Sequence, residues 1–398
     1  MKILITADCY TPTINGVVTS ILNLETELRR LGHDVKILCP SENFHSSESE
    51  NVYRIGSVGV GRIYSGARAA LRISQSHLQK LIDWKPDIIH SQSEFSSFIM
   101  AKRIAAEVNC PIVHTYHTVY ENYTHYFSPS ITLGRKAVIV MTKRILRHTK
   151  AVIAPSQKIE RLLKDYGIEQ PIKVIPTGLR LKKFSDEISV NIINELKAKL
   201  GIPLKSRVLI TVGRAAKEKN IDELIRYFKR LDIENTAFVI VGGGPYLDAL
   251  KDLAYAENIS DKMIFTGAVE PENIAAYYRL GDIFLSASQS ETQGLTYIEA
   301  LASGLPAVCR RDDCLNDVIT NGKNGGQYTD FKEFSELIRT FLFNDELYKS
   351  MSENAVQTAQ KYSAEKFAKD VETVYMEILE KRNHYEITNT FYNCENCS

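Results

Sequence analysis

A chain of 398 residues is long for one hydrophobic core and predicts two domains of ordinary size. With 44% apolar residues, 24% charged residues and a net charge of +1, its composition is that of a globular protein and excludes a largely disordered chain. No run approaches the ~20 apolar residues of a spanning helix, and "MKILITADCY" lacks the length of a signal-peptide core, so we expect a cytoplasmic protein.

Short β-type runs alternate with amphipathic helical stretches along the chain. The first series begins with a strand at 2–7, a helix at 17–31 and a strand at 34–39, and continues with "PDIIHSQ", "PIVHTYH" and "AVIAPS". After a junction near 180–204 a second series follows, with "RVLITVGR", "AFVIVGGGP", "MIFTGAV", "DIFLSAS" and "LPAVCR". This alternation predicts an α/β protein with two parallel sheets, each covered by helices on both faces. We expect the ligand site between the two sheets, beyond the carboxyl ends of their strands.

Seven cysteines, an odd number, lie mostly alone in apolar segments, which favours reduced buried thiols over a disulfide framework. Only Cys394 and Cys397 have the spacing of metal ligands. They lie in a polar C-terminal stretch without a second pair, which favours a dangling terminus.

Two residues of the first half follow strands at this ligand-binding edge. Gly16, in "DCYTPTINGVV", lets backbone approach a ligand and opens a helix whose amides can receive an anion, although a turn glycine would look the same. His117 ends "PIVHTYH", where a histidine serves as often in a structural hydrogen bond as in a site.

Arg214 and Lys219 lie five residues apart after a strand of the second half, in "GRAAKEKNID". Two cations there suit a diphosphate, and a solvated loop is the alternative. The nearby "VGGGP" indicates a turn, because it lacks the spacing of a dinucleotide-binding fingerprint.

The stretch "SETQGLTYIEALASGLPAV" places Glu291 and Glu299 on either side of a glycine, and we expect a helix to begin near Gly294. First-turn amides lie at the positive end of a helix without an acceptor inside it, so the backbone of Gly294, Leu295 and Thr296 is a candidate phosphate site. A carboxylate can accept two hydroxyl donors. The two glutamates are therefore candidates to hold the two sugars of a nucleotide sugar, with the hexose at Glu291 and the ribose at Glu299.

Basic residues are concentrated in the first half, where residues 1–180 carry 23 Lys and Arg against 15 Asp and Glu. Residues 122–159 hold seven bases and no acid. On a helix at ~100° per residue, an arc of about 60° holds four of them. The pattern predicts a membrane-binding helix, although a surface helix packed on its sheet by Val138, Met141 and Ile145 would look similar. No nucleic-acid motif accompanies the charge. The membrane-binding candidates are Lys136, Lys143, Arg144, Arg147 and Lys150.

Taken together, these motifs resemble the retaining glycosyltransferases of family 4, which have the two-domain GT-B fold. The resemblance covers about residues 1–380 and rests on the loop at Gly16, on His117, on the Arg214 and Lys219 pair, on "VGGGP" and on the two glutamates. Within the family, "HTYHTVYENYTHYF" is similar to bacterial enzymes that put glucose on diacylglycerol. "VIPTGLRLKKF" departs from the asparagine-glycine form more usual in the family, so no role is assigned there.

The resemblance implies roles for the site residues. Arg214 and Lys219 would hold the diphosphate, Glu299 the ribose and Glu291 the donor hexose. His117 would contact the hexose from the opposite domain, and the backbone from Gly267 to Val269 would meet the base.

It also implies an acceptor-side domain over 1–180 and a nucleotide-sugar domain over 181–363. A helix at about 364–381 would pack back on the first domain, before a polar tail over 382–398.

The predicted function is transfer of glucose from UDP-glucose to a membrane lipid such as 1,2-diacylglycerol, by a retaining enzyme peripheral on the inner face of the cell membrane. Cations and a helix end would stabilise the leaving diphosphate, so we expect no metal or other cofactor. The sequence has no carboxylate or histidine cluster typical of a metal site. Two alternatives are the same chemistry with a soluble acceptor, such as a small hydroxy acid or a polysaccharide, and a catalytically silent nucleotide-sugar-binding partner subunit.

Overall fold

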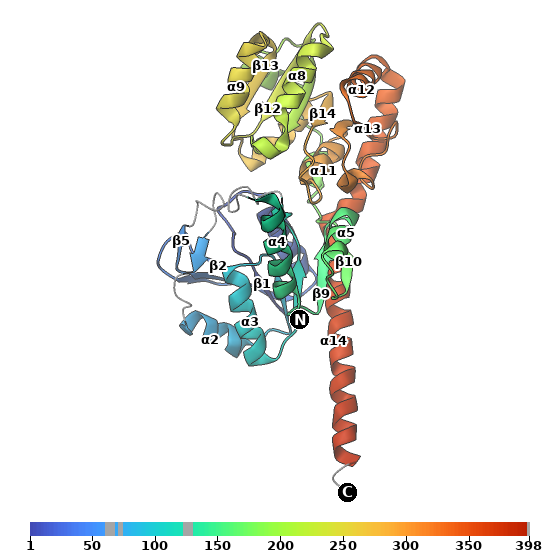
Figure 1. Cartoon of the computed structure of the whole chain (residues 1–398). Coiled ribbons are helices and arrows are strands. Elements are labelled where there is room, and N and C mark those ends of the chain that lie inside the picture. The colour runs from blue at the N-terminus through green and yellow to red at the C-terminus, as the bar shows by residue number, and fades with distance from the viewer. Residues whose placement is uncertain (60–67, 71–74, 122–129, 396–398) are drawn as a thin grey trace. The chain divides into compact units, whose positions relative to one another are not determined.

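The computed structural model describes residues 1–59, 68–70, 75–121 and 130–395, which form two units (Figure 1). The first unit comprises Met1–Gly178 and Ala364–Ser398, and the second comprises Leu179–Ser363. Each unit holds a sheet of mainly or wholly parallel strands with helices on both faces, so the predicted fold class is confirmed. Cys397 lies outside the described residues.

The sheet of the first unit is parallel except for its edge strand β3, which is antiparallel to β4. Its strands, in spatial order, are β10 (Ile172–Val174), β9 (Ala151–Ala154), β8 (Ile112–Thr115), β7 (Ile88–Ser91), β1 (Lys2–Thr6), β2 (Asp34–Pro40), β4 (Val52–Ile55) and β3 (Ser47–Ser49). A separate antiparallel pair is formed by β5 (Ser57–Gly59) and β6 (Arg68–Ala70).

The apolar run of β1 is buried on both faces of this sheet. Ile3 and Ile5 pack with α1 (Gly16–Arg30) and α14 (Ala364–Glu395), whereas Leu4 packs on the opposite face. Successive side chains of a strand point to opposite faces, so a continuous apolar run requires cover on both. The other helices of the unit are α2 (Gln75–Trp84), α3 (Ser96–Val108), α4 (Ile131–Leu146) and α5 (Gln157–Asp165).

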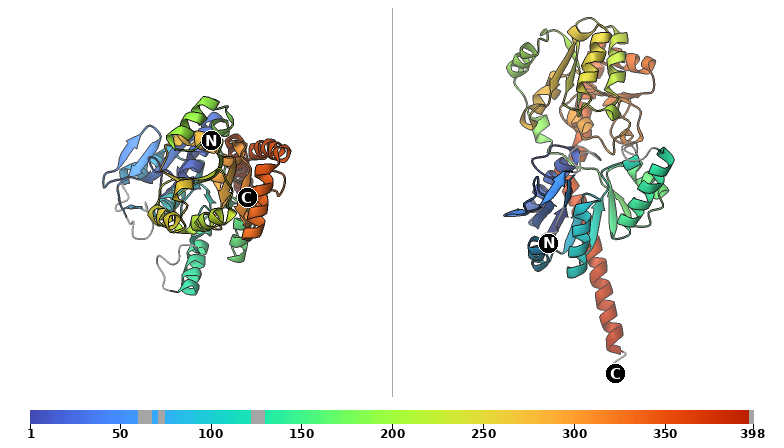
Figure 2. Two further views of the ribbon diagram at one scale, coloured as in Figure 1. Left: turned by 90° about the horizontal axis from the view of Figure 1, so that it is seen from above. Right: turned by 60° about the vertical axis from the view of Figure 1, so that its left-hand side comes forward.

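The helix expected over 364–381 packs on the first sheet but runs on to Glu395, through the stretch predicted as a dangling tail (Figure 2). The sequence contains no glycine or proline after Gly326, so no residue of either type interrupts the helix.

The sheet of the second unit is wholly parallel. Its strands, in spatial order, are β13 (Met263–Gly267), β12 (Thr236–Val241), β11 (Arg207–Val212), β14 (Ile283–Ser286), β15 (Ala307–Arg310) and β16 (Gly325–Tyr328). The helices are α6 (Lys182–Ser185), α7 (Val190–Lys199), α8 (Ile221–Leu231), α9 (Leu247–Ala256), α10 (Ile274–Leu280), α11 (Leu295–Ala302), α12 (Phe331–Phe343) and α13 (Asp345–Ala359).

Candidate functional site

The chain builds the second sheet outwards from β11, first towards β13 and then, from β14, in the other direction. At such a switch point the loops after the two neighbouring strands diverge and leave room for a ligand. Arg214 and Lys219 follow β11, and Glu291 follows β14. The structure therefore brings three of the predicted residues to one edge of the sheet.

Both predicted cations of this edge form ion pairs. Lys219 Nζ contacts the carboxylate of Glu291, which joins the loops after β11 and β14, and Arg214 contacts Glu218. Lys219 and Glu291 are partly buried, so solvent screens their attraction less than on an open surface. The sequence predicts that Lys219 binds a phosphate and that Glu291 binds the hexose. The structure places these two charged groups in contact.

The glycines of "VGGGP" pack against the loop that carries Arg214. A Cβ atom on Gly242 would lie 1.9 Å from the carbonyl oxygen of Gly213, and one on Gly244 would lie 2.3 Å from that of Ala215. No side chain fits at these distances, so glycine is required there. The motif that the sequence indicates only as a turn thus supports the loop of a predicted site residue.

Helix α11 begins directly after Gly294, as predicted, and this glycine has a φ of 78°. A Cβ atom there would lie 2.3 Å from the ring of the buried Tyr297, so both the backbone angle and the close approach require glycine. The amides of Leu295 and Thr296, at the start of α11, have no acceptor inside the helix. The helix end therefore keeps the donors and the positive dipole that suit a phosphate.

Glu299 lies one turn into α11, and its Oε2 accepts a hydrogen bond of 2.6 Å from the hydroxyl of Tyr278. Burial raises the pKa of Glu299, and the hydrogen bond from Tyr278 and the charge of Lys183 oppose this. The sequence analysis missed Tyr278, which comes from α10, because nothing in its spacing links it to Glu299.

The predicted base-binding backbone lies at the carboxyl end of β13. Gly267 ends the strand with a φ of 68°, and its carbonyl oxygen accepts a hydrogen bond of 3.0 Å from the amide of Gly242. Val269 is partly buried against the core of the second unit. The role of this backbone towards a base stays a prediction.

Gly16 and His117 belong to the first unit. Gly16 begins α1, where the side chain of Asn15 caps the helix by accepting a hydrogen bond of 2.9 Å from the amide of Val18. His117 Nε2 lies 2.6 Å from Oε1 of the buried Gln92. Burial and the neighbouring His114 lower the pKa of His117 to about 3, so its ring is neutral at physiological pH.

Asp8, which the sequence analysis did not single out, follows β1 and caps α3. Its carboxylate accepts hydrogen bonds from the amides of Phe95, at 2.9 Å, and Ser97, at 2.8 Å. Burial raises its pKa to about 6, although these two bonds favour the charged form. Asp8, which follows β1, thereby fixes the start of α3, which follows β7.

A buried polar group, also missed, lies at the same edge. Glu94 follows β7, and its Oε1 lies 3.3 Å from Nε2 of the fully buried His114, while the hydroxyl of Tyr120 donates to Oε2. Burial and Glu94 raise the pKa of Tyr120 well above its usual value, so Tyr120 remains a neutral donor.

Both halves of the chain match models of known protein families. The model described as "Glycosyltransferase Family 4" matches residues 14–183, and "Glycosyl transferases group 1" matches residues 192–358. The alpha-monoglucosyldiacylglycerol synthase of Streptococcus pneumoniae is 35% identical, over 96% of this chain and 87% of its own length. The chain belongs to the family 4 glycosyltransferases.

A second sequence relative and a solved structure are also similar to this glycosyltransferase. The alpha-monoglucosyldiacylglycerol synthase of Acholeplasma laidlawii is 33% identical, over 96% of this chain and 98% of its own length. Anabaena Alr3699/HepE in complex with UDP and glucose superposes with a TM-score of 0.75 at 16% identity, covering 95% of this chain and all of that one. At that identity the likeness concerns the fold, and the predicted GT-B fold is confirmed.

The five predicted membrane-binding residues of the glycosyltransferase lie on α4 or just after it, and all five are exposed. Val138 is buried, so the helix also packs on its unit through the face opposite to the bases. On the basic side the structure adds Leu133 and Val140, which are 66% and 65% exposed. At ~100° per residue, both fall within about 60° of Lys136.

No helix among the described residues is long and apolar enough to cross a membrane. Within residues 1–59, 68–70, 75–121 and 130–395, no group of three His, Cys, Asp or Glu side chains is arranged to hold a metal ion.

Proposed function

We propose that this glycosyltransferase transfers glucose from UDP-glucose to 1,2-diacylglycerol with retention of the anomeric configuration. Two relatives that align with 96% of the chain are named alpha-monoglucosyldiacylglycerol synthases, which supports the acceptor and the sugar. The observation that best supports binding of a nucleotide-sugar donor is the contact between Lys219 and Glu291 beside the start of α11.

The donor would lie across the start of α11. Its diphosphate would meet the first-turn amides and the side chains of Arg214 and Lys219, which supply the positive charge that two phosphates require. Glu291 would accept hydrogen bonds from the hexose, and Glu299, held by Tyr278, from the ribose. When the diphosphate attracts Lys219, the carboxylate of Glu291 becomes available to the sugar.

In the proposed reaction the acceptor oxygen bonds to the anomeric carbon on the face from which UDP departs, and the bond from that carbon to the diphosphate oxygen breaks. UDP keeps the electron pair, and one of its phosphate oxygens takes the proton of the acceptor hydroxyl. The protein contributes electrostatic stabilisation of the charge that grows on UDP. His117, with its pKa of about 3, would contact the hexose as a neutral ring.

The acceptor would be reached at an anionic membrane surface through α4. Each basic residue near such a surface contributes ~1 kcal/mol of attraction. Exposed apolar side chains among the bases are typical of helices that lie in a membrane interface, and Leu133 and Val140 provide them. The protein would thus be peripheral, with its basic helix on the lipid headgroups.

The test is incubation with labelled UDP-glucose, UDP-galactose or GDP-mannose and phosphatidylglycerol vesicles with and without diacylglycerol. We expect label in the lipid phase only with UDP-glucose and diacylglycerol. Label on malate or a polysaccharide in place of lipid would favour a soluble acceptor. Binding of UDP without any transfer would favour a silent partner subunit.

A further inference from the structure

Phe95 and Ile99 present an apolar surface at the start of α3. They are 48% and 61% exposed, and the amide of Ile99 donates to the carbonyl oxygen of Phe95 at 3.2 Å. Phe95 is the N-cap residue of α3 and Ile99 lies in its first turn, so the two exposed residues are at the same end of the helix. The ring of Phe95 packs edge-on against that of Tyr120, with the centroids 5.8 Å apart. Phe95, one of the two exposed apolar residues, therefore contacts the tyrosine whose hydroxyl donates to Glu94.

This surface belongs to a larger set of exposed apolar side chains on the first unit. Exposed apolar residues follow the carboxyl ends of four of its strands, β1, β2, β7 and β8: they are Ile14, Phe44, Phe95, Ile99 and Leu133. Carboxyl ends of neighbouring parallel strands meet at one edge of the sheet. The sheet edge that holds exposed apolar residues therefore also holds the buried Glu94, which follows β7.

The polar side chains at this edge include buried groups that lack a partner. His114 Nδ1 and Gln92 Nε2 have none among the described residues, although both side chains are buried. An unmade hydrogen bond of a buried polar group is unfavourable, so such groups usually have a bound partner. His114 lies on β8 and Gln92 directly follows the adjacent strand β7, and the imidazole of His114 contacts Glu94. These unpaired nitrogens are a second and independent sign that a ligand with polar atoms binds there.

We propose that Glu94 and Tyr120 bind the free hydroxyl of the diacylglycerol acceptor, and that Phe95 and Ile99 contact the first carbons of its acyl chains. This assignment rests on the proposed function and names the residues that would bind its acceptor. Diacylglycerol carries one hydroxyl beside two acyl esters, so it needs a small polar contact bordered by apolar surface. A soluble polyhydroxylated acceptor needs polar groups on all sides, which the exposed Phe95 and Ile99 do not offer.

Asp8 is a positioning residue in this arrangement. Its two carboxylate oxygens accept the amides of Phe95 and Ser97, so it sets the direction in which α3 starts. Glu94 lies two residues before the first residue of α3, and Ile99 lies in its first turn. A change at Asp8 would therefore move the polar and apolar contacts together.

The test compares Phe95→Ser/Ile99→Ser with the conservative Phe95→Leu/Ile99→Val and with Val190→Ser, which alters an exposed apolar residue of the second unit. Transfer is measured against the diacylglycerol fraction of phosphatidylglycerol vesicles at saturating UDP-glucose. Hydrolysis of UDP-glucose without acceptor and sedimentation with vesicles are measured in parallel. We expect the serine variant to raise KM for diacylglycerol about tenfold or more, as for the loss of methylene contacts in a substrate pocket. Hydrolysis and sedimentation should be unchanged, and both control variants should behave as the wild type.

Glu94→Gln provides the second arm, because it keeps the shape of the side chain and removes its charge. We expect a fall of about tenfold in kcat/KM for diacylglycerol with an unchanged UDP affinity, as for a weakened charged hydrogen bond. An unchanged KM in the serine variant, or a loss of sedimentation equal to its loss of transfer, would overturn the acceptor assignment. If the double variant does not fold, Ile99→Ser alone decides the question. A wild-type protein that makes no glucosyl-diacylglycerol would instead refute the proposed function, and the assignment with it.

Discussion

Lys219 and Glu291 form an ion pair that connects the loop after β11 to the loop after β14. The pair stands where the second sheet changes its direction of growth, next to the N-terminus of α11. A diphosphate at this helix end would compete with Glu291 for the ammonium group. The predictions concerning the donor follow from that competition.

Arg214→Ala and Lys219→Ala should each lower kcat ~10²-fold or more, because in the proposed reaction both cations stabilise the charge that grows on the leaving UDP. Lys217→Ala is the matched control, since Lys217 is exposed in the same loop and should be replaceable without effect. Steady-state kinetics with UDP-glucose and diacylglycerol vesicles measure the effect. Normal turnover of both folded variants would remove the diphosphate assignment.

Glu299→Ala should weaken UDP binding by ~1–3 kcal/mol, because in the proposed site the ribose hydroxyls lose their acceptor. The same change leaves the buried hydroxyl of Tyr278 without its acceptor, so it should also destabilise the fold. Adding Tyr278→Phe should recover the stability but not the affinity. Titration calorimetry with UDP separates the two effects, with the exposed Glu272→Ala as control. An unchanged affinity for UDP argues against the ribose role.

Gly294→Ala should lower the free energy of unfolding and weaken UDP binding, because Cβ would meet the ring of Tyr297 at 2.3 Å. Gly201→Ala is the control, since Gly201 has a similar positive φ of 70° but no atom within 4 Å of its Cβ position. We expect Gly294→Ala to cost ~1–3 kcal/mol more than the control, as for overpacking. Urea unfolding measures the difference, and equal losses would show that Tyr297 moves aside freely.

The contribution of His90 to stability should fall as the pH drops below about 6.5, the ordinary pKa of histidine. Burial holds the pKa of His90 well below that value, and His90 Nδ1 lies 2.6 Å from the hydroxyl of Tyr375. Between the two pKa values only the unfolded chain binds the proton, so the free energy of unfolding decreases with falling pH, by up to ~1.4 kcal/mol per unit.

Urea unfolding at pH 7 and pH 5 tests this dependence. His90→Asn should be less stable at pH 7 but should lose less on acidification, whereas the exposed His45→Gln should keep the wild-type dependence. Parallel pH profiles for the wild type and His90→Asn would contradict the prediction.

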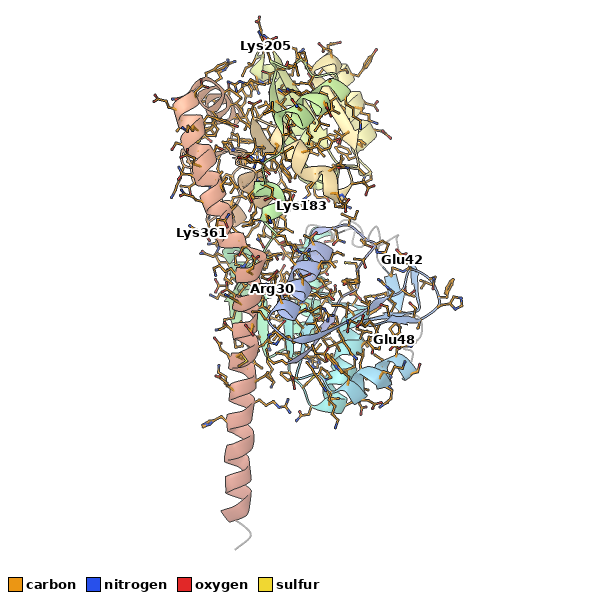
Figure 3. The ribbon with its side chains drawn as sticks, turned by 180° about the vertical axis from the view of Figure 1, so that it is seen from behind. Arg30, Glu42, Glu48, Lys183, Lys205 and Lys361 are labelled. Carbon is orange, nitrogen blue, oxygen red and sulfur yellow. The ribbon has the colours of Figure 1, made fainter. Side chains whose placement is uncertain are left out.

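Reversal of Lys143 and Arg147 to glutamate should weaken binding to anionic vesicles and leave UDP affinity alone. Each base contributes ~1 kcal/mol near such a surface, so two reversals should cost ~2–4 kcal/mol, or ~30- to 1,000-fold. Lys205→Glu, on the second unit, is the control (Figure 3). Added salt should weaken the parent protein in the same sense. Equal sedimentation of parent and reversed variant would identify α4 as an ordinary packed surface helix.

The sequence was informative where the physics is local or periodic. Apolar runs between helical stretches predicted both parallel sheets, and the strand before "SETQGLTYIEALASGLPAV" placed Gly294 at the start of α11. Chain order along the sheet then brought Arg214, Lys219 and Glu291 to one edge, as expected for strand-end residues.

Contacts between distant segments could not be predicted in this way. Tyr278, on another helix, donates its hydroxyl to Glu299. Asp8 caps α3 by accepting the amide of Phe95, which lies 87 positions further along the chain. Side-chain exposure also depends on packing, so the helical wheel predicted the bases of α4 but not the exposed Leu133 and Val140 beside them.

The central claim is that glucose is transferred to diacylglycerol with retention of its anomeric configuration. The proton NMR spectrum of the lipid product tests this claim most directly. Purified protein is incubated with UDP-glucose and diacylglycerol vesicles, and the extracted lipid is examined at its anomeric signal. UDP-glucose has an α-linked glucose, so a retaining enzyme should give α-glucosyl-diacylglycerol as the lipid product. A β-linked product would contradict retention, and the absence of any glucosylated lipid would contradict the proposed acceptor.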